Sequence, residues 1–347
     1  MRTGHAVETY GRLLALTTNP ITWAWAGALV AALVALPWAV SGHLLVVSTT
    51  VLIATVGVVG LNVLTGTTGL ISLGQSGFLA IGGYACGLLI RDLSLPTELA
   101  VPLAGLITGT LSLLIGVPSL RLKGLYLAIT TLAASLIVIH IILYAEPLTG
   151  GPFGLRIPDV SFLGLRIADG RGMYYIALIV AVLTVVFVNN LMRSRSGRAW
   201  IALRDHDIAA KSMGIDLVRY KLLSFFVSSS IVGVAGALMA LQLRFITADV
   251  FGLFLSIEAL AMLLVGGVGS VAGAILGAAF IVLLPEIARG LLALVGWTGE
   301  TGSAHVFEIR AVVTGVLIIV MLRIEPDGLI GIWRRTKRYW LQWPLSV

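Results

Sequence analysis

Charged residues are scarce in this sequence. Asp, Glu, Lys and Arg make up 11% of the 347 residues, whereas 58% are hydrophobic and the mean hydropathy is +1.03. Because soluble domains carry about 25% charged residues, this composition excludes a water-soluble core. Apolar runs of about twenty residues recur, without the alternation that marks a barrel. They predict an all-α polytopic membrane protein, with residues 1–347 as a single transmembrane domain.

Cysteine is nearly absent as well. Cys86 is the one cysteine and lies inside an apolar run, which excludes a disulfide framework and a cysteine-based metal site. The sequence also lacks the motifs GxxxxGKS/T, HExxH, GxSxG and CxxC. One dinucleotide-like fragment, Gly267–Ala272, follows no soluble strand. We therefore expect a chain that is not an enzyme, has no metal site and has no ATPase site of its own.

Apolar segments of spanning or nearly spanning length occur ten times, and the eighth is short. They lie at residues 21–40, 44–64, 69–90, 98–117, 125–143, 174–191, 222–243, 255–268, 271–292 and 308–323. If the N-terminus is cytoplasmic, most Lys and Arg residues fall on the cytoplasmic side, as the positive-inside rule requires. This orientation explains the net charge of +7 without nucleic acid. The ten segments predict about ten transmembrane helices. The distribution of charge predicts that both termini are in the cytoplasm, with a basic cytoplasmic tail at about 324–347 and an extracytoplasmic loop at about 144–173.

The basic segment 192–221 is the longest polar interruption in the second half of the chain. Asp207 can cap the start of a short helix, Lys211 suits its negative end, and Gly214 suits a left-handed closing residue. A helix of under two turns is marginal in water, so it should dock on the membrane domain or on another protein. A basic loop that only fixes topology would explain the arginines but not the capped helix.

This loop resembles the cytoplasmic loop of permeases from ATP-binding-cassette (ABC) importers. Ile208–Gly214 follows the pattern EAA-x3-G with Ile208 in place of Glu, and the later I-x-LP part is absent. The chain is similar instead to the branched-chain amino acid permease family, whose motifs it matches in order over roughly residues 57–290. The matching motifs include Gly60-Leu61-Asn62, Ser72-Leu73-Gly74-Gln75, Leu148-Thr149-Gly150-Gly151, Ser196-Gly197-Arg198-Ala199, Arg219-Tyr220-Lys221, Ser256-Ile257-Glu258 and Gly266-Gly267-Val268-Gly269-Ser270.

The resemblance implies a permease of the ABC-importer type in the bacterial inner membrane. Such a subunit would translocate branched-chain or related small amino acids. Its partners would be two cytoplasmic ATPase subunits that bind ATP and Mg, a second related permease, an extracytoplasmic solute-binding protein and membrane lipid. Residues 204–215 would couple the chain to the ATPase. The residues that carry over to this role are Arg204, Asp205, Asp207, Ala209, Ala210, Lys211, Met213 and Gly214.

The segment Thr65–Tyr84 has no charge but contains six glycines and several polar residues. Glycine weakens a helix, and polar groups at membrane depth need a partner or a watery cavity. We predict a broken helix that lines the solute path, with a tightly packed kink as the alternative. The candidates for the path are Asn62, Ser72, Gln75, Ser76 and Glu258.

Other functions stay open at this point. The same kind of permease could import urea or short amides. An ionised Glu258 in an apolar run costs about 3 kcal/mol, and it could carry the proton of a secondary transporter, although the 204–215 helix then has no role. A membrane-embedded transferase would need acids, histidines or arginines clustered at one membrane face, and the sequence shows no such spacing.

Overall fold

The structure is a computed structural model. It describes residues 20–120, 122, 124–158, 161–162, 165–166, 170–294, 315–316, 323 and 327–342. The predicted tenth span, 308–323, lies almost entirely outside the described residues.

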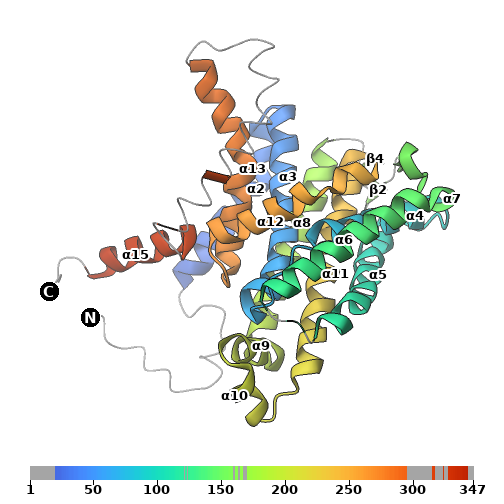
Figure 1. The fold of residues 1–347 in the computed structure, drawn as a ribbon. Coiled ribbons are helices and arrows are strands. Elements are labelled where there is room, and N and C mark those ends of the chain that lie inside the picture. Colours follow the sequence, from blue (N-terminus) through green and yellow to red (C-terminus); the bar gives the residue numbers. More distant parts are fainter. Residues whose placement is uncertain are drawn as a thin grey trace.

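Long helices dominate the described part of the chain (Figure 1). They are α2 (Pro20–Ala39), α3 (Gly42–Leu61), which continues as the π-helix η1 (Asn62–Thr67), α4 (Gln75–Arg91), α5 (Thr97–Ser119), α6 (Leu125–Tyr144), α8 (Gly170–Arg193), α11 (Leu217–Leu243), α12 (Leu253–Gly266) and α13 (Val271–Leu294). Each of the first nine predicted spans overlaps one of these helices. The chain is therefore a multi-pass helical membrane protein.

Six helical segments of the described residues are long and apolar enough to cross a membrane. They are Gly42–Thr67, Thr97–Ser119, Leu125–Tyr144, Gly170–Arg193, Leu217–Leu243 and Ala248–Gly266. Two shorter apolar helices cover Gly27–Ala39 and Val271–Ile287. The predicted total of ten spans and the cytoplasmic placement of both termini stay predictions.

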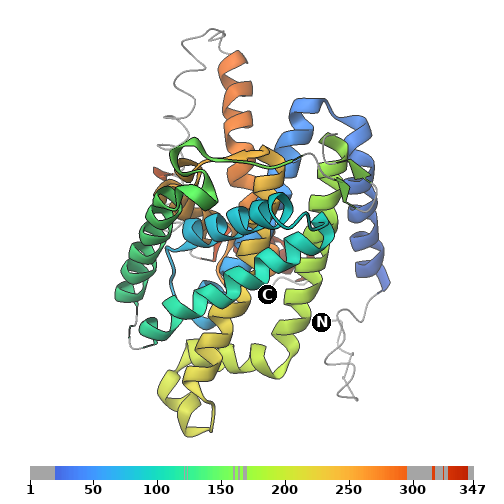
Figure 2. The same ribbon diagram turned by 90° about the vertical axis from the view of Figure 1, so that its right-hand side faces the viewer.

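Helix α11 lies at the centre of the bundle and packs against α3, α4 and α5 (Figures 1 and 2). Glycines make this close packing possible. Gly82 of α4 lies on the backbone of Gly233, and Gly105 and Gly109 of α5 lie on Ser230 of α11. Interfaces of this kind suit membrane helices, because small residues let neighbouring backbones approach closely.

The polar connections gather at opposite ends of α11. The short helices α9 (Arg195–Asp205) and α10 (Asp207–Ser212) precede its first residue. At its far end, β4 (Phe245–Ile246) pairs antiparallel with β1 (Leu155–Arg156). Figures 1 and 2 both show α10 at one extremity of the molecule and the β1–β4 region toward the other. Segment 192–221 and the described residues of segment 144–173 therefore lie at opposite ends of the bundle.

Smaller elements complete the end that carries β1 and β4. They are α7 (Glu146–Thr149), η2 (Gly151–Phe153), the antiparallel pair of β2 (Ser161–Phe162) and β3 (Leu165–Arg166), and η3 (Ala248–Phe251). Arg91 at the end of α4 donates to the Leu148 carbonyl at 3.0 Å and to the carboxylate of Asp92. The hydrogen bond from Arg91 lowers the pKa of Asp92 below its ordinary value. Helix α15 (Gly328–Gln342) packs against α12 and α13.

Replacing Gly82 by Ala should destabilise the bundle. A Cβ at this position would meet the carbonyl of Gly233, which is backbone and cannot rotate away. Overpacking of this kind costs about 1–3 kcal/mol, so the apparent melting temperature in detergent should fall. Gly42→Ala is the matched control, because nothing lies within 4 Å of a Cβ built there. Equal melting temperatures for the two variants would contradict the packing described for α4 and α11.

Candidate functional site

Helix α9 is docked firmly on the membrane domain. It buries Ala199, Trp200 and Leu203, which follow helical spacing along one face. Trp200 is fully buried, and its Nε1 donates to the carbonyl of Tyr220 in α11 at 2.9 Å. The first helix of segment 192–221 is therefore held rigidly against the start of α11.

Helix α10 is a separate rod of under two turns, as the sequence predicts. Its end is a Schellman motif, in which Ile215 N–H donates to the Ala210 carbonyl at 3.1 Å and Gly214 N–H to the Lys211 carbonyl at 3.0 Å. Gly214 has φ +83°, the left-handed conformation predicted for it. Ala210 is buried, while Ala209 and Lys211 are exposed. The geometry of the closing turn is therefore confirmed.

The predicted cap at Asp207 is wrong. His206 occupies the N-cap position with φ −155° and ψ 105°, its side chain makes no capping bond, and Asp207 is the first residue of α10. The chain is extended at His206, so Arg204 and Asp205 end α9 and do not start the next helix. Asp207 still lies in the first turn, where a carboxylate stabilises the positive end of the helix dipole.

The far side of α10 presents apolar side chains to its surroundings. Ile208 is 78% exposed and Met213 is 86% exposed. Their neighbour Lys211 is exposed too. Two large apolar side chains at the tip of a basic loop form a surface that we call the apex of α10.

Arg204 connects this region to the end of α3. Its Nη1 donates to the Gly66 carbonyl of η1 at 2.6 Å. Gly66 lies within two residues of the end of the helix, where carbonyls lack an intrahelical donor. A Cβ at Gly66 would meet Asn62 and the backbone of Gly269. The guanidinium therefore satisfies an orphan carbonyl at a point where only glycine fits.

Asn62 lies on the other side of the same junction and is fully buried. Its Oδ1 accepts from the Gly269 N–H at 2.9 Å, in the turn between α12 and α13. Its Nδ2 has no partner within the described part of the chain. Asn62 thus joins helices, and its place on a solute path stays a prediction.

The helix breaks after η1, as predicted for Thr65–Tyr84. Residues 69–74 are not helical, and α4 begins at Gln75. Ser72 accepts from Gly74 N–H at 3.2 Å, and Ser76 bonds to Ser256 of α12 through both its N–H and its hydroxyl oxygen. Ser72 therefore satisfies a backbone N–H at the break, and Ser76 joins the start of α4 to α12. Neither serine lines the cavity described in the next paragraph.

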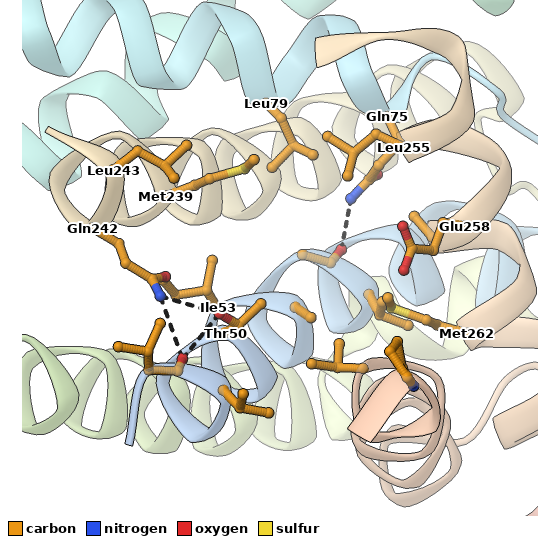
Figure 3. A pocket seen from close by; sticks show the side chains of 18 of the residues that line it. Thr50, Ile53, Gln75, Leu79, Met239, Gln242, Leu243, Leu255, Glu258 and Met262 are labelled. Carbon is orange, nitrogen blue, oxygen red and sulfur yellow. Dashed lines mark hydrogen bonds between the residues drawn. The ribbon is translucent and has the colours of Figure 1, made fainter. Parts of the chain in front are cut away.

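A cavity of about 390 Å³ lies beside the break, between α3, α4, α11, α12 and α13 (Figure 3). Gln75 and Glu258 line it, so the structure brings together two of the five predicted path residues. Glu258 is 5% exposed. The amide of Gln75 donates from Nε2 to the Gly57 carbonyl at 3.1 Å. The volume lies in the range of small-molecule sites.

Other polar residues of this cavity are absent from the sequence prediction. Gln242 of α11 donates to the Thr50 hydroxyl at 3.1 Å and lines the cavity with it. Glu286 of α13 lines it as well and lies 3.3 Å from the ring of His43. Gln242 and Glu286 are both polar interruptions of apolar runs, the same signal that identified Glu258.

The comparisons with known proteins agree with this architecture. The family described as branched-chain amino acid transport system / permease component matches residues 42–322. The chain belongs to this family. It is 33% identical to the high-affinity branched-chain amino acid permease protein LivM of Salmonella typhimurium and 34% identical to LivM of Escherichia coli, each over 88% of this chain and 74% of the relative. A probable LivM of Methanocaldococcus jannaschii is 30% identical over 67% of both chains. No solved structure matches.

Gly214 gives a direct test of the closing turn of the permease's α10. Nothing lies within 4 Å of a Cβ built there, so its substitution changes only the backbone energy. Gly214→Ala should destabilise the turn by about 1 kcal/mol, whereas Gly214→Asn should cost less, because Asn tolerates the left-handed region. Hydrogen exchange of amides 208–215 should accelerate in the Ala variant and change less in the Asn variant. The same exchange rate in both variants would contradict the assignment.

Proposed function

We propose that this chain is the membrane-spanning permease subunit of an ABC importer that moves branched-chain amino acids across the bacterial inner membrane. The observation that carries the proposal is the rigid connection between an exposed apolar apex and a broken membrane helix. The apex consists of Ile208 on α10 and Met213, the residue that follows α10, and Arg204 joins the adjoining α9 to η1. Membership of the family supports the type of transport system and the solute.

The chain would act only with partners. Two cytoplasmic ATPase subunits would bind the ATP and Mg, and each permease would dock one of them. A second, related permease would complete the membrane domain, and a solute-binding protein would deliver the amino acid. The apolar apex of α10 suits a groove on an ATPase, since burying Ile208 and Met213 would stabilise the complex.

The mechanism follows from the contacts of α9. When the ATPases close on ATP, they would displace α10, and α9 would move with it. Because the Arg204 guanidinium holds the Gly66 carbonyl, that displacement would reach η1 and the non-helical segment 69–74. This segment leads directly into Gln75 at the cavity. The break in the helix would then be the part that changes shape to open and close the path.

One observation favours a different class, a proton-coupled secondary transporter. Glu258 is almost fully buried and lines the cavity, as a proton carrier would. Uptake distinguishes the two functions. The importer requires the ATPases, the binding protein and ATP for leucine uptake into proteoliposomes, whereas the secondary transporter works alone on a proton gradient. Urea in place of leucine as the transported solute would support the amide-importer alternative.

A carboxylate at the apex should prevent ATPase docking. Ile208→Asp and Met213→Asp each place a charge on the surface proposed to be buried, and each should greatly reduce co-purification with the ATPase subunits. Phe153→Asp is the matched control. Phe153 is 80% exposed, as Ile208 and Met213 are exposed, but lies in η2 at the opposite end of the bundle. Normal co-purification of both apex variants would refute the docking surface.

Arg204→Ala should separate ATP hydrolysis from transport. The apex remains intact, so the ATPases should still bind, but the Gly66 carbonyl loses its donor and leucine uptake per ATP should fall at least fivefold. Arg198→Ala is the control, because Arg198 also donates to one backbone carbonyl, that of Arg193 at 2.8 Å, without reaching η1. Unchanged uptake per ATP in Arg204→Ala would show that coupling runs elsewhere.

A further inference from the structure

Two carboxylates line the cavity beside Gln75, those of Glu258 and Glu286. Glu286 lies 3.3 Å from the ring of His43, and none of the described lining residues themselves is Lys, Arg or His. The rest of the wall is mostly apolar, with Thr50, Gln75 and Gln242 as its neutral polar groups. A cavity with acidic groups and an apolar wall favours a positively charged ligand that also carries hydrocarbon.

The lining groups are separated in space. Figure 3 shows Glu258 and Gln75 near one another on one side of the cavity, and the pair Gln242 and Thr50 on the other. Apolar side chains lie between them. They include Ile53, Leu79, Met239 and Leu255. A ligand with one polar end and one short aliphatic end therefore has a place for each.

Gln75 can supply a second recognition group. A side-chain amide has two N–H donors, and one hydrogen bond from Nε2 is made to the Gly57 carbonyl. The second donor can turn to a ligand carboxylate beside Glu258. A Cβ at position 57 would approach Nε2 to 3.3 Å, so Gly57 provides the room in which this amide lies. Ammonium, carboxylate and hydrocarbon can then be held together.

We infer that this cavity binds an aliphatic amino acid, with the ammonium group on Glu258, the carboxylate at the Gln75 amide and the side chain against Ile53, Leu79 and Leu255. The inference rests on the proposed function and assigns a solute site to a position inside one permease chain. It makes Glu258 a ligand of the solute and not a carrier of coupling protons.

Binding should be measured on the complete complex of permeases and ATPases in lipid nanodiscs, without the binding protein. Tritiated leucine is the probe. Two analogues compete: isopentylamine, which keeps the ammonium and lacks the carboxylate, and 4-methylpentanoate, which keeps the carboxylate and lacks the ammonium. Isopentylamine should compete at least tenfold better than 4-methylpentanoate, because the ammonium makes the charged contact in a cavity lined by carboxylates.

Variants of Glu258 test the same contact. Glu258→Gln should weaken leucine binding at least tenfold, and Glu258→Asp should weaken it less, since the charge is kept but withdrawn. Glu98→Gln, in the first turn of α5, removes a carboxylate that does not line the cavity and should leave the affinity unchanged. If Glu258→Gln fails to assemble, Glu258→Asp and the two analogues still decide the question.

Equal competition by the two analogues, an unchanged affinity in Glu258→Gln, or no leucine binding at millimolar concentration would overturn the inference. The same preparation is assayed for ATP-driven leucine uptake with the binding protein added. If ATP-dependent uptake is observed together with any of these results, the proposed function is kept and only the binding site in the cavity is rejected. Absence of ATP-dependent uptake by the wild-type complex removes the proposed function itself.

Discussion

The structure depends on one constraint, which is that a break between two packed helices leaves backbone groups without their intrahelical partners. Where such groups are buried, other elements must supply the hydrogen bonds. In this chain, residues of several elements form hydrogen bonds with the backbone at and beside the break at residues 69–74. Thr65 donates to the Leu70 carbonyl, Leu73 N–H donates to Thr131 of α6, and Ser76 N–H donates to Ser256 of α12. Hydrogen bonds therefore tie the chain at and beside the break to η1, α6 and α12.

Arg204 belongs to the same set of contacts but comes from outside the membrane bundle. Arg204 satisfies a backbone carbonyl of η1 by donating to Gly66. Thr131 and Ser256 likewise satisfy backbone N–H groups after η1, those of Leu73 and Ser76. The short polar helix α9 is thereby made part of the hydrogen bonding of the apolar helix segment that ends in η1. This explains why segment 192–221 is ordered and closely docked, which a loop that only fixed topology would not need.

Local features of this arrangement could be predicted from the sequence. The break follows from the density of glycine between Thr65 and Tyr84, and the left-handed Gly214 follows from its place after a short helix. The prediction of a helix cap at Asp207 is wrong, because the capping preference of Asp does not show where one short helix ends and the next begins. In the structure His206 is extended, so that α9 ends at Asp205 and α10 begins at Asp207.

Long-range pairings could not be predicted, because they depend on which helices meet. Nothing in the sequence around Arg204 indicates that its partner is Gly66, 138 positions away. Gln242 and Glu286 interrupt apolar runs as Glu258 does, yet only the packing of α11 and α13 on α3 brings them to one cavity. Polarity within a span thus identifies a residue that needs a partner, and the tertiary structure decides whether that partner is protein or solute.

The cavity and the break also depend on each other. Gln75 is the first residue of α4, so its amide can reach Gly57 only because the chain turns back after η1. A continuous helix through residues 69–74 would carry position 75 away from α3 and remove one wall of the cavity. The same turn places Ser76 against α12, the helix that carries Glu258. Movement of η1 would therefore reach Gln75 through residues 69–74, while the Ser76–Ser256 hydrogen bonds hold the start of α4 against the helix that carries Glu258.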